Sequence, residues 1–255
     1  MNFFLSLYAL AHREIIRFLR QPHRVLGAIG QPLLFWLLMG SGFGASFKPM
    51  GFSNTSYMTY FFPGVMLMIL LFTAIFSTFS IIEDRNEGFL QGVLVSPVSR
   101  LSIVLGKILG GACVALIHAS LFLLIWPFLG HDVSFVKLLE LVGFMFLVAA
   151  SLTSFGFSLA WRMDSMQGFH AIMMMVLLPM WFLSGAFFPS EGLPGLLKFL
   201  ISANPLTYAL SGIRWLLDPS LDVHLLPSLS LSLGVVIIFF GINLMISWCL
   251  IRRSR

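Results

Sequence analysis

The chain has 255 residues, of which 58% are hydrophobic and only 10% are charged, and its formal net charge is +5. Soluble domains average about 25% charged residues, so this composition excludes an ordinary soluble protein. The short alternating segments of a transmembrane barrel are absent, and both cysteines, Cys113 and Cys249, lie in apolar runs, which argues against a disulfide framework. We therefore predict an all-α polytopic membrane protein. At about 20 residues per span, the length allows about six transmembrane helices.

Residues 2–20, within an N-terminal unit of residues 1–24, predict a basic amphipathic helix that lies in the plane of the lipid headgroups. Because proline cannot continue a helix, Gln21-Pro22 is expected to end it before the first span. The two faces keep register along the helix: Phe4, Tyr8, Ala11, Ile15 and Phe18 form the apolar face, and Arg13, Arg17, Arg20 and Arg24 form the basic face.

The rest of the chain, residues 25–255, is predicted to form a single membrane domain. Between the last two apolar runs the chain carries several prolines, and its cleanest uncharged run, Phe199–Ile213, contains Asn204-Pro205. That run is too short to span a bilayer and is expected to form re-entrant or interfacial half-helices. Six other runs are long enough to span: about 25–47, 57–82, 101–130, 138–161, 168–188 and 225–251.

Positive charge is distributed unequally between the two sides of this six-span arrangement. Because cytoplasmic segments carry the excess of lysine and arginine, we expect both termini and residues 83–107 to be cytoplasmic. The opposite side holds Lys48, Lys137, Lys198 and Arg214. The other eleven of the fifteen cations fall on the side of the termini: Arg13, Arg17, Arg20, Arg24, Arg85, Arg100, Lys107, Arg162, Arg252, Arg253 and Arg255.

Residues 83–107 form the longest segment dense in charge between two apolar runs. One charge in the middle of a span costs about 2.5–3.5 kcal/mol or more, so we expect this segment to lie in water. Phe89, Val93 and Leu94 are spaced as one apolar helix face, and Ser96-Pro97 ends the run. The pattern favours a short amphipathic helix that contacts something outside the membrane, and the alternative is a solvated connector.

No catalytic or metal-binding constellation is visible in the sequence. The six histidines include no pair at metal-ligand spacing, and Gly106-Lys107 is followed by Ile108 instead of the Ser or Thr of a phosphate-binding loop. We therefore expect the chain to bind no metal or cofactor and to hydrolyse no ATP. His118 lies deep in an apolar run, where we expect a neutral ring bonded to a neighbouring helix, with a proton relay as the alternative.

Three segments carry a family resemblance, in the same order along the chain as in that family. Residues 83–107 contain acidic residues, a glycine and then Ser-Pro before span 3. Pro179–Pro194 is similar to a Ser-Gly-x-x-x-Pro end of span 5, and Asn204–Trp215 is similar to an Asn-Pro-Leu-Thr-Tyr…Arg motif. Together, and with the six-span length, they resemble the permease subunits of type-2 ATP-binding-cassette (ABC) exporters.

The resemblance implies a homodimer, or a pair with a related permease, in the cytoplasmic (inner) membrane of a bacterium. It would export a substrate with ATP and Mg bound by two copies of a separate ABC ATPase, and no nucleic acid is expected as a partner. Residues 1–24 would be the connecting helix, with Arg13, Arg17 and Arg20, and Asn86–Pro97 the coupling helix that docks into the ATPase. Residues 192–217 would be re-entrant outer helices, with the motif Asn204, Pro205, Tyr208 and Arg214.

The resemblance also assigns residues to ATPase coupling. Glu87 and Arg85 are expected to pair with the arginines of the connecting helix and so to lock neighbouring elements together. The connector of residues 162–167 is a candidate for a second docking contact. The full coupling set is Glu83, Arg85, Glu87, Gly88, Phe89, Leu90, Val93, Leu94, Ser96 and Pro97.

Aromatic and methionine side chains of spans 2 and 5 are candidates for a substrate path. Methionine repacks around varied shapes, so such a path suits a drug, a lipid or another amphipathic molecule. Helix core or lipid contact is the alternative fate of these side chains. Export of a polysaccharide or lipid-linked glycan, an intramembrane enzyme and a non-transporting assembly subunit also stay open. The candidate path residues are Phe72, Thr73, Phe76, Phe79, Met173, Met174 and Met180.

Overall fold

The computed structural model describes residues 3–44, 56–131, 134–187, 194–217 and 227–253. Every regular element in these ranges is a helix, and six helical segments are long and apolar enough to cross a membrane. The predicted fold class is therefore confirmed. Some predicted features lie outside the described residues: the span ends at 45–47, 188 and 225–226, Lys48, Pro189, Arg255 and the side chain of Arg24. The six segments are Val25–Phe43, Tyr57–Asn86, Arg100–Leu129, Phe135–Ala160, Met166–Ala186 and Leu229–Arg253.

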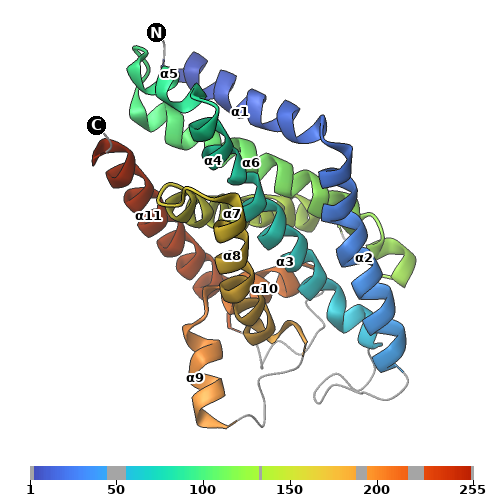
Figure 1. Ribbon diagram of the computed structural model, residues 1–255. Helices are drawn as coiled ribbons and strands as arrows, with labels where there is room; N and C mark the ends of the chain where they lie inside the picture. Colours follow the sequence, from blue (N-terminus) through green and yellow to red (C-terminus); the bar gives the residue numbers. More distant parts are fainter. Residues whose placement is uncertain (1–2, 45–55, 132–133, 188–193, 218–226, 254–255) are drawn as a thin grey trace.

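Figure 1 shows a bundle whose two ends differ. The start of α1, the end of α11 and the short α5 lie at one end, which we call the α5 end, and α9 lies at the opposite end. The elements are α1 (Phe3–Leu19), α2 (Pro22–Gly44), α3 (Tyr57–Ser77), α4 (Phe79–Asn86), α5 (Phe89–Val95), α6 (Arg100–Leu123), η1 (Trp126–Leu129), α7 (Phe135–Ala160), α8 (Met166–Trp181), η2 (Phe182–Ala186), α9 (Gly195–Ala203), α10 (Pro205–Leu217) and α11 (Leu229–Arg253).

The first helix ends where its sequence predicts, but it buries a different face from the predicted one. α1 stops at Leu19, and Pro22 opens α2, because proline at the first helical position needs no hydrogen-bond partner for a backbone N–H. α1 packs along α6 with Ser6, Leu10, Glu14 and Phe18, which recur every four residues. Phe4 and Tyr8 of the predicted apolar face stay exposed, and the position of α1 in the headgroup plane stays a prediction.

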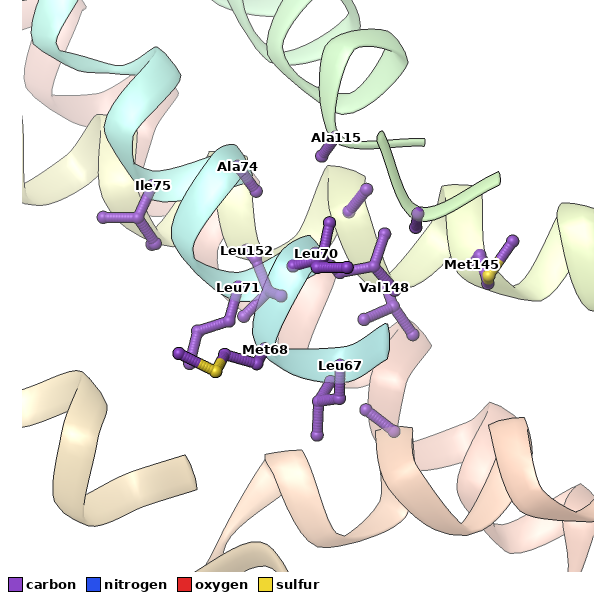
Figure 2. Close-up of a cluster of buried hydrophobic side chains, with 14 of the residues drawn as sticks. Leu67, Met68, Leu70, Leu71, Ala74, Ile75, Ala115, Met145, Val148 and Leu152 are labelled. Atoms are coloured by element: carbon purple, nitrogen blue, oxygen red, sulfur yellow. The ribbon is translucent and has the colours of Figure 1, made fainter. Parts of the chain in front are cut away.

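The core of the bundle surrounds α3, which packs against α2, α6 and α7. Figure 2 shows Leu70 of α3 beside Val148 of α7, and Ala74 of α3 on the side of Ala115 of α6. Lipid tails are as apolar as these side chains, so helix association in a membrane depends on close packing instead of exclusion of water. The small alanines provide it by letting the backbones approach. α3 is thus held on three sides and is the helix around which the others are arranged.

Residues 195–217 form two short helices, as predicted, and they break at Asn204. The Asn204 side chain donates Nδ2 to the carbonyl of Met180 at 2.6 Å and accepts the backbone N–H of Leu206 at 3.0 Å. Pro205 opens α10, since the asparagine has already turned the chain. The break keeps either helix from being long enough to span a membrane alone. Their re-entrant position relative to the bilayer stays a prediction.

Candidate functional site

A cluster of ionised side chains joins α1, α4 and α6 near the α5 end, and Asp84 of α4 lies at its centre. Asp84 is charged, yet it is 0% exposed. Arg13 donates Nη2 to its Oδ1 at 2.7 Å and Nη1 to its Oδ2 at 3.0 Å, which makes a bidentate pair. Arg17 donates Nη1 to Oδ1 at 2.6 Å. One carboxylate thereby holds two arginines from successive turns of α1.

Lys107 brings α6 into the same cluster. Its Nζ donates to Asp84 Oδ2, to Glu14 Oε1 at 2.6 Å and to Ser80 Oγ at 3.1 Å, so all three donors of the ammonium group have acceptors. Lys107 and Glu14 are both buried. The prediction that residues 83–107 lie in water is therefore wrong at Asp84 and Lys107. Asp84 and Lys107 are paired with each other inside the protein, and this attraction offsets part of the free energy that removing each charge from water costs.

Two glycines of α6 allow α1 to come close enough to place Glu14. A Cβ added to Gly106 would lie 2.8 Å from Leu10 Cβ, and a Cβ added to Gly110 would lie 2.7 Å from Glu14 Cβ. Real atoms do not approach so closely. The Gly106-x-x-x-Gly110 spacing matches the small-residue pattern that brings membrane helices together. Close helix packing and the buried ion pair therefore depend on the same stretch of α6.

The charges of the cluster are balanced. Three cations, Arg13, Arg17 and Lys107, face three carboxylates, Glu14, Glu83 and Asp84. Burial disfavours the charged form of Arg13, but the hydrogen bond and the charge of Asp84 outweigh burial and hold the pKa of Arg13 above its ordinary value. Removing one partner of a buried pair costs about 3–5 kcal/mol because the other charge is left uncompensated. The cluster is therefore stable as a whole and intolerant of single neutralisations.

The predicted pairing with the arginines of α1 is confirmed for Glu87, which forms a long ion pair with Arg17, and is wrong for Arg85. Arg17 Nη2 contacts Glu83 Oε2 at 2.8 Å, whereas Glu87, which is largely exposed, stands at 3.8 Å. The expectation for Arg85 is wrong, since like charges repel and this side chain points away from α1. It donates to the carbonyls of Trp161 at 2.5 Å and Met163 at 3.0 Å and contacts Asp164 at 3.2 Å. Arg85 thus ties α4 to the connector of residues 162–167.

The short helix α5 follows α4 after a sharp turn at Gly88, whose φ of 79° is a conformation that favours glycine. Its buried residue is Leu90, while the predicted apolar residues Val93 and Leu94 are half-buried. Phe89 is exposed on one side and lies under the guanidinium of Arg13, 3.8 Å from ring centroid to carbon. Val95 is 86% exposed. α5 therefore contacts the ion cluster through Phe89 and presents apolar surface outward.

A cavity of about 240 Å³ lies between α2, α3 and α8, with Phe18 of α1 also in its wall. Five of the seven candidate path residues line it: Phe72, Thr73, Phe76, Phe79 and Met174. Met173 is fully buried in the core, and the backbone of Met180 accepts a hydrogen bond from Asn204. Neither of these two methionines lies in the cavity wall, because adjacent helical positions differ in direction by about 100°.

The outer motif holds the end of span 5 in an irregular conformation. Gly185 in η2 has a φ of 86°, and its carbonyl accepts Arg214 Nη2 at 3.0 Å and the Tyr60 hydroxyl at 3.1 Å. The guanidinium of Arg214 also lies over the Tyr60 ring, 4.5 Å from its centroid. Tyr208 donates to the carbonyl of Ser202 at 2.9 Å. The contacts of Gly185 tie α3, η2 and α10 together, and the Tyr208 hydrogen bond ties α10 to α9.

His118 is buried, but the prediction of a bond to a neighbouring helix is wrong. Its Nδ1 lies 2.8 Å from the carbonyl of Val114, one turn back on the same helix. The ring packs edge-on against Phe18 of α1, with centroids 5.3 Å apart. His118 therefore supports the contact between α1 and α6 in the described structure.

The sequence reasoning missed Glu14, Ser80, Asp84 and Lys107 as members of one site. Two signals were present: Glu14 is the one acidic residue in a basic helix, and Lys107 lies seven residues inside the apolar run that α6 forms. A buried lysine needs a carboxylate partner, and Glu14 and Asp84 were available from flanking helices. The choice between candidate partners needed the positions of the helices.

Comparison with known proteins gives a consistent result. Residues 6–217 match the family described as ABC-2 type transporter. The chain is 32% identical over 224 residues to the ycf38 transport permease of Cyanophora paradoxa, covering 86% of this chain and 76% of that protein. It is 28% identical over 265 residues to the inner membrane transport permease YadH of Escherichia coli K12, covering 99% and 97%. It is 24% identical over 239 residues to the daunorubicin resistance ABC transporter permease protein DrrB1 of Streptomyces coeruleorubidus, covering 89% and 80%.

Proposed function

Because the chain belongs to the ABC-2 type transporter family, we propose that it is the membrane-spanning subunit of an exporter driven by a separate ABC ATPase. ATP and Mg bind to that partner, and two copies of this chain form the permease. The names of two relatives support the choice of membrane and the kind of transport system: YadH is an inner membrane transport permease, and DrrB1 is a daunorubicin resistance ABC transporter permease protein. The substrate moves outward across the cytoplasmic membrane.

The observation that carries this proposal is the ion cluster beside α5. ATPase subunits can drive transport only if a movement at the membrane surface reaches the spans. α5 contacts Arg13 through Phe89, and Arg13 is bound to Asp84 of α4. Lys107 ties the same carboxylate to α6. A displacement of α5 therefore moves α1, α4 and α6 as one unit.

The helix path from the cluster into the membrane has one break. α3 ends at Ser77 and α4 begins at Phe79, with Thr78 between them donating its hydroxyl to the carbonyl of Ile75 at 2.6 Å. A side chain that bonds back to its own helix often marks a bend. α4 can thus tilt with the cluster while α3 stays packed in the core, and the bend at Thr78 opens or closes the space beside it.

The orientation follows from charge. Figure 1 places the start of α1 and the end of α11 at the α5 end, and Arg100 bonds there to the carbonyls of Ile251 and Arg252. Because α1, α4, the first turns of α6 and the end of α11 are rich in arginine and lysine, we assign this end to the cytoplasm. The ATPase then meets the exposed side of α5. The connector of residues 162–167 is the second contact, since Arg85 fixes it to α4 and Asp164 is 94% exposed there.

The test compares two equally exposed apolar residues at opposite ends of the bundle. Val95→Asp places a charge on the outward side of α5, and Phe128→Asp places one in η1, where Phe128 is 88% exposed. Each variant is co-expressed with a candidate ABC ATPase from the same genome and purified in lipid nanodiscs. We expect Val95→Asp to lower co-purification of the ATPase at least tenfold and Phe128→Asp to leave it unchanged. Equal retention of the ATPase by both variants contradicts the proposed docking surface.

A further inference from the structure

A groove of about 470 Å³ lies between α1 and the turn that joins α4 to α5. Unlike the cavity beside the bend, the groove is lined almost entirely by polar side chains. Arg13 and Arg17 of the ion cluster form part of its wall, together with Arg20 at the end of α1 and Glu87 in the turn. The groove therefore lies directly beside the ion cluster and opens away from it to the surroundings of the protein.

Two charges in the groove lack a close partner. Arg20 is exposed, and its side chain makes no ion pair or hydrogen bond within the described residues. Glu87 has 63% of its side chain exposed and approaches Arg17 only to 3.8 Å. Arg13 and Arg17, by contrast, bond to the carboxylate of Asp84 at 2.6–3.0 Å. The described part of the groove thus offers one available cation and one available anion, so a ligand that carries both charges matches it.

Both charges lie close to the ends of apolar spans. The first candidate span begins at Val25, five residues after Arg20, and the second ends at Asn86, directly before Glu87. The headgroup layer on each side of a bilayer is about 5–8 Å thick. Five residues of a helix rise about 7.5 Å, so Arg20 lies within this layer. The groove is therefore at the depth where phospholipids carry their phosphate and amine groups.

Two exposed leucines flank the groove on the side of the first span. Leu19 precedes Arg20 and is 47% exposed, and Leu26, the second residue of the span, is 70% exposed. Apolar side chains at this depth lower their free energy by contact with acyl chains. A ligand with a charged head and an apolar tail therefore finds matching surroundings for both parts.

We propose that the groove binds one zwitterionic phospholipid with a primary amine, of the phosphatidylethanolamine class. Its phosphate pairs with Arg20 and its ammonium group donates to Glu87, while an acyl chain passes over Leu26. A headgroup with only a negative charge leaves Glu87 without a partner, and a choline headgroup has no N–H to donate to a carboxylate. The lipid is a bound ligand that joins α1 to the turn before α5, and its binding needs no ATPase.

The experiment measures the affinity of the full chain for its first bound lipid, in detergent micelles and without an ATPase, by native mass spectrometry. The probes are phosphatidylethanolamine, phosphatidylglycerol and phosphatidylcholine with the same palmitoyl and oleoyl chains. We expect the unaltered chain to bind phosphatidylethanolamine about fivefold more tightly than either of the other two lipids, which is the effect of one partly exposed ion pair.

Two substitutions separate the two charges of the groove. We expect Glu87→Gln to remove the preference for phosphatidylethanolamine over phosphatidylglycerol, and Arg20→Gln to weaken the binding of both lipids about fivefold. Both side chains are exposed, so the variants are expected to fold. The matched controls are Arg253→Gln, an exposed arginine at the end of α11, and Asp164→Asn, an exposed carboxylate of the connector. We expect both controls to leave all three affinities unchanged.

Soluble glycerophosphoethanolamine carries the same headgroup without acyl chains. At the concentration of the lipid, we expect it to leave phosphatidylethanolamine bound, because it lacks the contact with Leu26. If it displaced the lipid, the groove would be a site for a soluble zwitterion and the proposal would be wrong.

Three further results overturn the proposal. They are equal affinities of the unaltered chain for phosphatidylethanolamine and phosphatidylglycerol, a preference that survives Glu87→Gln, and loss of ATPase co-purification by Arg20→Gln with unchanged lipid affinities. The last result assigns the groove to the ATPase contact. Failure of the proposed function has a different signature, in which the lipid preferences hold but Val95→Asp leaves ATPase co-purification intact.

Discussion

Two regions that lie along α3 and α4 differ in charge, in packing and in hydrogen bonding. At the α5 end, three cations and three carboxylates are packed into a buried cluster that joins α1, α4 and α6. Beside the bend at Thr78, half-buried phenylalanines line a largely apolar cavity. The cluster has little freedom to rearrange, because each charge is fixed by its partners. The cavity has no such constraint.

The comparison shows that rigidity and adaptability belong to different regions of the molecule. A set of paired buried charges has one arrangement of low free energy, so it transmits displacement without absorbing it. An apolar cavity with aromatic and methionine walls tolerates several ligand shapes and several helix positions. Phe18 belongs to both regions, since it lines the cavity and follows Arg17 on α1. Under the proposed function, the region that transmits movement and the region with the cavity are thus separate but adjacent.

The largest effect is expected at the centre of the cluster. Asp84→Asn keeps the side-chain volume but leaves Arg13, Arg17 and Lys107 without their shared charge. We expect the free energy of unfolding to fall by about 3–5 kcal/mol. Thermal unfolding of the purified protein in detergent measures this, with Asp164→Asn on the exposed connector as a control that leaves stability unchanged. If Asp84→Asn melted at the same temperature as the control, the ion cluster would not stabilise the fold as we describe.

Two adjacent methionines sharpen the contrast between core and cavity. Met173 is fully buried, whereas Met174 lines the cavity. We expect Met173→Ala to lower the free energy of unfolding by about 2–5 kcal/mol, because it creates a void among packed side chains. Met174→Ala enlarges a space that already exists, so its cost is expected to stay near 1 kcal/mol. Similar losses for the two variants in the same unfolding measurement would mean that the cavity wall is as tightly packed as the core.

The smallest of these effects is expected where α1 meets α6. Gly110→Ala puts a Cβ 2.7 Å from Glu14 Cβ and 3.0 Å from the Ala11 carbonyl, so α1 must shift. We expect a loss of about 1–3 kcal/mol. Gly143→Ala is the matched helical control, since nothing lies within 4 Å of its added Cβ. Should both glycines tolerate alanine equally well in thermal unfolding, the contact between α1 and α6 would be looser than we describe.

Much of the fold follows from local pattern. The sequence predicts the six apolar runs, the break at Gln21-Pro22 and the short helices around Asn204. Each depends on residues that are close together in the chain, because span length follows the thickness of the hydrocarbon layer and proline ends a helix locally. Phe72, Phe76 and Phe79 were predicted to belong to one substrate path, and all three line the cavity. Met173 was grouped with them because the composition of a span does not show which side of the helix faces the cavity.

The ion cluster could not be predicted in the same way. Glu14, Asp84 and Lys107 are separated by tens of residues, and each alone resembles a charge at the edge of a span. The cost of a charge in hydrocarbon argued for placing residues 83–107 in water, and that argument fails when two opposite charges meet inside the protein. Arg85 was assigned to α1 for its position, but the side of α4 on which it lies faces Trp161 and Met163.

The central claim is that the cluster links α5 to the cavity, and Glu14→Gln tests it most directly. This variant keeps the size of Glu14 but removes the charge that Lys107 Nζ contacts at 2.6 Å, while Lys107 retains Asp84 and Ser80. The measurement is ATPase turnover in nanodiscs, for the ATPase alone and for its complex with the permease, after both permease variants have been brought to the same amount of assembled complex. We expect the variant to be less stable than the unaltered chain, but to assemble with the ATPase and to lose at least four-fifths of the stimulation of turnover by the permease. Stimulation equal to that of the unaltered chain would contradict the claim.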